Sequence, residues 1–197
     1  MENASRPEHR SVKAGVREKA QLMSASEIDR TLLRLAYEII ERHDGAEGLV
    51  FVGIRRRGVP LAERLAGKIG EIEKASPPVA TLDITFYRDD LSTVDSKPVV
   101  RKQAAPFSIE AKDVILVDDV LYTGRTTRAA LDALVDMGRP RRVELCVLID
   151  RGHRELPIHA DHVGRTVQTS DTEVIEVRLR EVDGEERVML CERVATA

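Results

Sequence analysis

Tryptophan is absent from the 197-residue sequence, and all aromatic residues together make up only 3% of it. This scarcity argues against a protein that binds single-stranded nucleic acid by stacking bases on aromatic side chains. The formal net charge is only −3, so nucleic-acid binding would need a local basic patch and not attraction by the whole surface. No run of 18 apolar residues and no signal-peptide core occur, so we expect a cytoplasmic protein without membrane contact.

Cysteine is also rare. The two cysteines, Cys146 and Cys191, each lie in an apolar, strand-like segment, so we expect reduced core residues and not a disulfide. No Cys/His spacing predicts a zinc site. With 42% hydrophobic and 33% charged residues, the chain has the composition of a globular protein, and its length favours one domain.

The most informative stretch is residues 114–127. Its first four residues are apolar and three of them are β-branched, which predicts a central parallel strand covered on both faces. Asp118 and Asp119 fall where that strand is expected to end, and ligands of open α/β sheets bind at such ends. A turn at Gly124 then opens a predicted helix to about residue 137, which Thr123 or Thr126 would cap. The positive end of this helix predicts a phosphate site.

The acid pair and the phosphate turn together predict one ligand. Two carboxylates can accept hydrogen bonds from adjacent ribose hydroxyls, and the turn can hold a phosphate on the same sugar, so a sugar 5-phosphate fits both. The alternative is that Asp118 and Asp119 only end a strand in water and Gly124 only makes a turn. The G-x-x-x-x-G-K-[ST] spacing of a P-loop is absent.

A second anion site is predicted where residues 49–54, a buried strand, lead into Arg55, Arg56, Arg57 and Gly58. A helix follows over residues 59–72, and three arginines before a helix N-terminus favour an anion pocket. The alternative is a solvated basic turn.

The remaining segments are predicted from periodicity and turn residues. We expect a helix from Ser24 or Ser26 to residue 42, strands over 79–86 and 142–149, and a terminal hairpin of 172–180 and 187–192. Residues 87–107 have no periodicity, which favours a lid over the site or a surface insertion. Residues 1–21 are expected to form a disordered arm.

Residues 114–127 resemble the binding motif for 5-phosphoribosyl-1-pyrophosphate (PRPP) of type I phosphoribosyltransferases. More narrowly, the chain resembles the family of bifunctional regulators of pyrimidine operons that are also uracil phosphoribosyltransferases. Residues 52–58, 83–91, 117–126 and 150–157 carry this closer resemblance, and they occur in the family's order. The resemblance covers about residues 22–192.

The resemblance implies an α/β fold of the type I phosphoribosyltransferase class. Its central, mainly parallel sheet would be flanked by helices, with a small hood and a C-terminal β-hairpin. After the arm of residues 1–21, residues 22–197 would form the single domain. The flexible lid would cover about residues 87–107, and the hood about residues 150–170.

The resemblance also implies the reaction of uracil with PRPP, which gives UMP and pyrophosphate. Asp118 and Asp119 would be catalytic residues that position the ribose hydroxyls, and Arg88 in the lid would meet the phosphates. Mg²⁺ would bind mainly through PRPP oxygens and water. The implied nucleotide-binding residues are Val120, Leu121, Tyr122, Thr123, Gly124, Arg125, Thr126 and Thr127. Arg55, Arg56, Arg57 and Gly58 would bind pyrophosphate, Arg139 a nucleotide phosphate, and Val163 the base.

Tyr122 departs from the wider family, because purine-salvage relatives commonly carry an acid at this position. A tyrosine with an ordinary pKa of about 10 is a poor general base near neutral pH. Tyr122 therefore argues against a purine substrate, and no side chain of the sequence stands out as the proton acceptor.

The second implied function is binding of pyrimidine-operon mRNA, controlled by UMP or UTP, in a homodimer or a dimer of dimers. Two alternatives stay open. The chain could be a non-catalytic sensor of UMP or UTP that binds RNA, or a phosphoribosyltransferase for another base without RNA binding.

Overall fold

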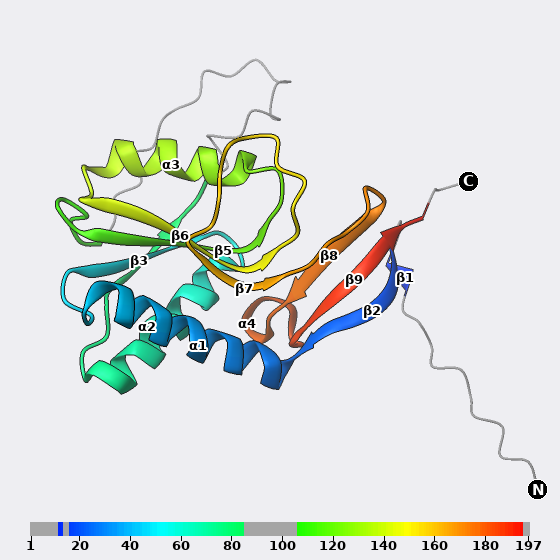
Figure 1. Ribbon diagram of the computed structural model, residues 1–197, viewed down its shortest axis with the longest axis horizontal. Helices are drawn as coiled ribbons and strands as arrows, with labels where there is room; N and C mark the ends of the chain where they lie inside the picture. The colour runs from blue at the N-terminus through cyan, green and yellow to red at the C-terminus, as the bar shows by residue number, and fades with distance from the viewer. Residues whose placement is uncertain (1–11, 14–15, 85–105, 195–197) are drawn as a thin grey trace, which may run out of the picture.

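The computed structural model describes residues 12–13, 16–84 and 106–194, which form two sheets (Figure 1). The larger sheet has five strands in the order β4-β3-β5-β6-β7, and every neighbouring pair is parallel. Its strands are β3 (Leu49–Ile54), β4 (Val79–Leu82), β5 (Asp113–Leu121), β6 (Arg142–Asp150) and β7 (His162–Thr166). All six residues of β3 are buried, as expected for a central parallel strand.

Helices cover both faces of the parallel sheet. α1 (Ala25–His43) and α2 (Gly58–Glu73) lie on one face, and α3 (Arg125–Met137) lies on the other (Figure 1). Two apolar clusters correspond to these faces, one with the buried side chains of α1 and α2 and one with those of α3. The predicted α/β architecture with a central parallel sheet is confirmed.

The predicted start of α1 is confirmed at Ser24. The backbone N–H of Glu27 donates to Oγ of Ser24 at 3.4 Å, and the backbone N–H of Ser24 donates to the Glu27 carboxylate at 2.8 Å. This reciprocal capping box satisfies N–H groups that have no partner inside the helix. Ile28, Leu32 and Leu35 then point into the core at helical spacing.

β5 is longer than its apolar run predicted. Asp118 and Asp119 do not follow the strand but lie inside it, because β5 pairs with β6 as far as Leu121. The polarity of the two acids ended the predicted strand too early. In the structure, the neighbouring strand supplies hydrogen bonds that keep the backbone extended past them.

The second sheet is antiparallel and has the order β1-β2-β9-β8. It consists of β1 (Val12–Lys13), β2 (Val16–Ser24), β8 (Glu173–Arg178) and β9 (Arg187–Arg193), with the short helix α4 (Arg180–Asp183) between β8 and β9. The predicted C-terminal hairpin is confirmed by the pairing of β8 with β9. Side chains of β8 and β9 belong to the same apolar cluster as α1 and α2.

Two boundaries predicted from the sequence are wrong. The expected disordered arm reached residue 21, but residues 16–21 belong to β2, which pairs with β9 at the other end of the chain. The expected hood covered residues 150–170, but residues 162–166 form β7, the edge strand of the parallel sheet. Periodicity within one segment does not reveal a pairing partner far away in sequence. Residues 1–11 and 85–105, which include most of the predicted lid, lie outside the described residues.

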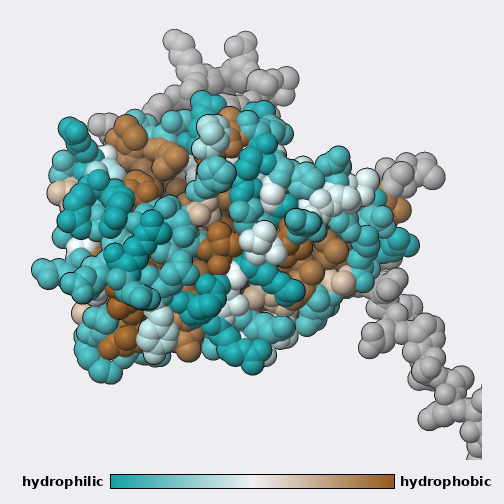
Figure 2. Space-filling model, in the orientation of Figure 1, coloured by the Kyte–Doolittle hydropathy of each residue, from teal (hydrophilic) through white to brown (hydrophobic). Residues whose placement is uncertain are grey.

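Cys146 and Cys191 are buried free thiols, so the prediction of reduced core cysteines is confirmed. Burial raises the pKa of the Cys146 thiol to about 12, which makes it unreactive near neutral pH. No helix in the described part of the chain is long and apolar enough to cross a membrane. Hydrophilic residues cover most of the face in Figure 2, and hydrophobic surface is divided among separate patches.

The contact between α2 and β5 predicts opposite effects for two glycines of the same helix. A Cβ atom on Gly58 would lie 2.2 Å from the carbonyl oxygen of Val117, whereas a Cβ atom on Gly67 would meet nothing within 4 Å. We expect Gly58→Ala to lower the free energy of unfolding by about 1–3 kcal/mol or more, because backbone must move. Gly67→Ala should raise it by about 0.5–1 kcal/mol. Urea unfolding measures both, and a Gly58→Ala variant as stable as the wild type would contradict the close approach.

Candidate active site

The carboxyl ends of β3, β4 and β5 meet around a cleft of about 570 Å³. This volume is typical of small-molecule sites, and the position is the usual one in open α/β sheets. The structure therefore brings together the arginine turn, the acid pair and the start of α3, which are far apart in sequence. The residues that line the cleft are Ile54, Arg55, Arg56, Arg57, Asp83, Ile84, Asp118, Asp119, Val120 and Thr126.

The arginine turn lies between β3 and α2. Arg55 forms an ion pair with Asp83 at 3.2 Å, and the peptide bond between Arg55 and Arg56 is cis. Arg57 donates two hydrogen bonds to the carboxylate of Asp183 in α4, at 3.0 and 2.8 Å. The bond to Asp183 raises the pKa of the Arg57 guanidinium, so Arg57 is a fixed positive charge beside the acid pair.

Two helices begin at this cleft without a side-chain cap. α2 has Arg57 as its N-cap residue and α3 has Gly124; neither helix has a side-chain capping bond or an acid in its first turn. Thr123, one of the two threonines predicted to cap α3, accepts the backbone N–H of Arg125 at 3.4 Å, but the N-cap residue is Gly124. Gly124 takes the cap position because its φ of +92° suits glycine. Free N–H groups and two positive helix ends make the cleft suited to a ligand with two anionic groups.

The first acid of the pair, Asp118, is buried, and Asp119 is partly exposed. Asp118 is 7% exposed, and its Oδ1 atom accepts the backbone N–H of Asp119 at 2.9 Å. Burial raises the pKa of Asp118 well above the ordinary value, and the negative charge of Asp119 raises it further. Burial also raises the pKa of Asp119, and the charge of Arg57 is among the opposing effects. The pair is therefore suited to hydrogen bonding with neutral hydroxyl groups of a ligand.

Charged side chains of the segment after β6 hold the loop after β5 in place. The guanidinium carbon of Arg151 lies 4.1 Å from the ring centroid of Tyr122, a cation–π contact. Arg154 donates to the backbone oxygen of Tyr122 at 2.8 Å, and Arg125 pairs with Glu155 at 2.7 Å. These contacts fix the loop that precedes α3.

The other predicted site residues lie in different parts of the structure. Leu121 and Thr127 are buried and support the loop from the core, while Val120 lines the cleft. Arg139 precedes the amino end of β6, whereas the cleft lies at the carboxyl ends of the strands. The residues lining the cleft do not include Arg139. Val163 lies in β7, where its carbonyl oxygen accepts a hydrogen bond from Arg34 at 2.9 Å. Arg88 lies outside the described residues.

Two acids at the site, Asp83 and Asp183, were not predicted from the sequence. Asp83 follows β4 and lines the cleft, and its place after a parallel strand was a signal that could have identified it. Asp183 binds Arg57 across 126 positions of sequence, and no local pattern predicts such a contact.

The chain is similar to known phosphoribosyltransferases. A family model described as phosphoribosyl transferase domain matches residues 21–181. The bifunctional protein PyrR of Pelotomaculum thermopropionicum is 62% identical over 176 residues, which are 89% of this chain and 97% of that protein. The bifunctional protein PyrR of Thermus thermophilus is 58% identical over 178 residues, 90% of this chain and 98% of that protein.

Solved structures share the fold. The hypoxanthine phosphoribosyltransferase of Trypanosoma cruzi superposes with a TM-score of 0.67 at 15% identity, covering 90% of this chain and 98% of that one. A hypoxanthine phosphoribosyltransferase of Staphylococcus aureus gives a TM-score of 0.65 at 21% identity, covering 87% and 92%. At these identities the likeness concerns the fold alone, and it confirms the fold class that the sequence predicted.

Burial of the acid pair predicts that Asp118→Asn stabilises the protein near neutral pH. An aspartate whose pKa is raised by folding opposes folding when the pH lies above its ordinary value of 3.8, and it has no such effect below that value. Asparagine keeps the acceptor oxygen and removes the charge. We therefore expect Asp118→Asn to raise Tm at pH 7, by about 2–4 °C for each kcal/mol. The gain should shrink as the pH falls toward 4.

Thermal unfolding of both proteins across this pH range measures the effect. Asp132→Asn is the matched control, because the Asp132 side chain on α3 is 57% exposed and its charge remains in contact with water. A Tm gain that is the same at pH 4 and pH 7 would contradict the burial argument.

Proposed function

Because the chain belongs to the phosphoribosyltransferase family, and within that family to the PyrR proteins, we propose that it is a uracil phosphoribosyltransferase that also regulates pyrimidine genes. The reaction joins uracil to the ribose of PRPP and gives UMP and pyrophosphate. The observation that carries the proposal is the cleft, where Asp118 and Asp119 lie between two helix N-termini and beside three arginines. A cytoplasmic site of action is part of the proposal.

The chemical groups of PRPP match the cleft in order. The 5-phosphate binds at the start of α3, where Gly124 places no side chain at the N-cap position. The ribose hydroxyls donate to Asp118 and Asp119. The pyrophosphate group binds at the start of α2 beside Arg56 and Arg57. One sugar with an anion at each end therefore occupies the whole cleft.

The transfer step breaks the bond between ribose C1 and the pyrophosphate oxygen and forms a bond between C1 and N1 of uracil. The electron pair of the broken bond leaves with pyrophosphate. The N1 proton of uracil passes to water or to the departing pyrophosphate. Arg56 and Arg57 stabilise the charge that grows on the leaving group. Asp118 and Asp119 hold the ribose in place, so most of the rate gain comes from positioning.

The cleft also fits the magnesium ion that accompanies PRPP. Its acidic lining consists of Asp83, Asp118 and Asp119, which offer only oxygen donors, as a hard cation prefers. When bound, Mg²⁺ neutralises negative charge on the pyrophosphate group. The protein's own part is to supply carboxylates that hydrogen-bond to ribose hydroxyls and to metal-bound water.

Preference for uracil over a purine is supported by Tyr122. The Tyr122 ring packs against the guanidinium of Arg151, which is 5% exposed and also donates to the carbonyl oxygen of Glu173 at 2.8 Å. The position therefore provides an aromatic packing residue and no carboxylate base. Val163 is proposed to contact uracil, and Arg88 to contact the phosphates from the lid. Arg139 is proposed to act across a homodimer, or a dimer of dimers, because it lies far from the cleft of its own chain.

Binding of pyrimidine-operon mRNA is supported by a basic hollow on α1 and β7. Arg30, Arg34 and Arg165 line a cavity of about 300 Å³ there, on a surface separate from the cleft. Local basic groups can bind RNA phosphates even though the net charge of the chain is negative. UMP or UTP in the cleft would then control RNA affinity. If the chain does not turn over PRPP, the same contacts would serve a nucleotide sensor.

The enzyme assay measures pyrophosphate release from PRPP and Mg²⁺ with uracil, hypoxanthine or guanine in turn. We expect turnover with uracil, and a loss of at least about 100-fold in Asp118→Asn, because the hydroxyl contacts act in the transition state. Asp132→Asn on the exposed face of α3 should retain wild-type activity. Turnover with a purine base in place of uracil would replace the substrate assignment, and no turnover with measurable UMP binding would favour the sensor.

The RNA assay measures binding of pyrimidine-operon leader RNA at several salt concentrations, with and without UMP. We expect UMP to increase affinity and Arg30→Gln to weaken binding, because Arg30 is an exposed cation of the basic hollow. The slope of log K against log salt should fall by about 0.7–0.9 for one lost phosphate contact. Arg128→Gln, on exposed α3, is the control. Equal slopes for all three proteins would exclude this hollow as the RNA surface.

A further inference from the structure

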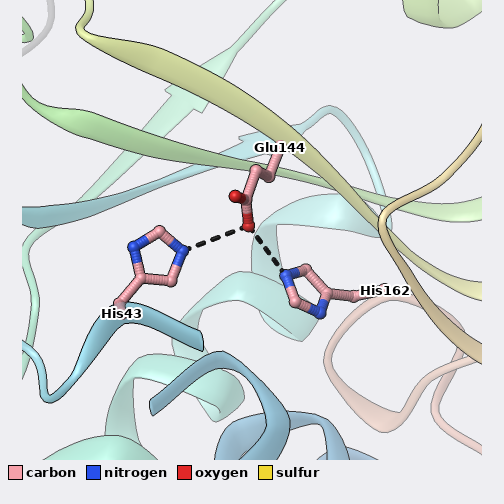
Figure 3. A group of neighbouring side chains, drawn as sticks. All are labelled: His43, Glu144 and His162. Carbon is pink, nitrogen blue, oxygen red and sulfur yellow. Dashed lines mark hydrogen bonds and ion pairs between the residues drawn. The ribbon is translucent and has the colours of Figure 1, made fainter. Parts of the chain in front are cut away.

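Two histidines and a glutamate meet at the edge of the parallel sheet opposite the cleft. His43 ends α1, Glu144 lies near the start of β6, and His162 begins β7 (Figure 3). All three side chains are buried, with 2%, 3% and 0% of their surfaces exposed. Glu144 pairs in register with Ile115, three residues before the acid pair of β5, so the cluster is separate from the proposed reaction site.

The two imidazoles converge on one oxygen atom. Nε2 of His43 lies 3.1 Å from Oε2 of Glu144, and Nε2 of His162 lies 2.9 Å from the same oxygen (Figure 3). One donor atom from each of the three residues lies within 4.8 Å of the others. Imidazole nitrogen and carboxylate oxygen are zinc ligands, and two histidines with one glutamate form a recurrent zinc-binding set.

The second nitrogen of each imidazole faces another carboxylate. Nδ1 of His162 lies 2.7 Å from Oε1 of Glu38, and Nδ1 of His43 lies 3.3 Å from Oδ2 of Asp113. Metal-binding histidines usually donate their other N–H group to such an acceptor, which orients the ring and raises its basicity. A supporting acceptor is therefore in place on His162, while Nδ1 of His43 faces both Asp113 and an N–H donor of Arg142.

His162 also has a proton requirement that a metal would satisfy. A neutral imidazole has one N–H group, yet His162 contacts a carboxylate oxygen through each of its nitrogens. A cation at Nε2 would remove the need for a proton there. With a metal at Nε2, the single proton of a neutral ring stays at Nδ1 and donates to Glu38.

The two oxygens of Glu144 have different surroundings. Arg42 and Arg142 lie 3.4 and 3.2 Å from Oε1 of Glu144, but this buried oxygen has no hydrogen-bond partner within the described ranges. Arg142 also lies 3.2 Å from Nδ1 of His43. Asp113 is held by Arg141 through two hydrogen bonds. With Arg34, which pairs with Glu38 at 3.2 Å, four arginines face the three carboxylates of Glu38, Asp113 and Glu144.

We propose that His43, Glu144 and His162 bind one zinc ion that joins the end of α1 to β6 and β7. Glu144 binds through Oε2, since Oε1 faces the two arginines. Two imidazole nitrogens favour zinc over magnesium, which prefers oxygen ligands, so the site is distinct in chemistry as well as in place from the PRPP cleft. The role is structural, because the ion is buried at the far edge of the sheet from the reaction.

The test uses the full-length protein after treatment with a chelator, titrated with zinc chloride in a calorimeter and followed by thermal unfolding. We expect one zinc ion per chain and a Tm that rises with zinc concentration. His162→Gln should abolish both effects. His159→Gln is the matched control, because His159 is exposed and is not part of the cluster.

A second variant keeps the test decisive if His162→Gln does not fold. Glu38 has 40% of its side chain exposed and would contact the metal only through His162, so Glu38→Gln should fold and weaken zinc binding by about 10–100-fold. Zinc binding that is unchanged in Glu38→Gln and His162→Gln would overturn the proposal. So would wild-type protein whose Tm does not respond to zinc, and the cluster would then hold protons alone.

Discussion

Two carboxylates buried side by side at the end of a β-strand oppose folding unless positive charge lies near them, and the structure supplies that charge from several directions. The N-termini of α2 and α3 begin at the same cleft, and three arginines follow β3. α2 can approach so closely only because residue 58 has no Cβ atom between the helix and the backbone of Val117. The position of the reaction site therefore depends on backbone packing as much as on the acids themselves.

The segment between the last two strands of the small antiparallel sheet contributes to this arrangement through contacts with Arg57 and Arg64. Asp183 of α4 holds Arg57 with two hydrogen bonds and also accepts the backbone N–H of Leu179 at 2.9 Å. Arg64 of α2 adds ion pairs to Glu181 and Glu186 on the same side. The second sheet is thus joined to the arginine turn by charges that are partly shielded from water, and such pairs are costly to break one partner at a time.

The sequence predicted the parts of the molecule that depend on local pattern. The apolar runs identified β3 and β5, the Ser24 capping box identified the start of α1, and the arginine turn and the acid pair were correctly expected to line one site, although the acids lie inside β5 and not after it. Local pattern failed where distant segments meet. β2 needs β9 to be a strand, Arg57 needs Asp183, and His43 needs Glu144 and His162, each across more than 100 positions. None of these pairs leaves a periodic signal in either segment alone.

The pairing of β2 with β9 has a consequence for synthesis on the ribosome. Residues 16–24 are made long before their hydrogen-bonding partners, residues 187–193. The parallel sheet can form while translation continues, since β3, β4, β5, β6 and β7 all precede β8 in the chain. During that time the N-terminal strand exposes an unpaired edge, which is the kind of surface that chaperones protect and that other chains can pair with. Closure of the small sheet must therefore wait until residues 187–193 have left the ribosome.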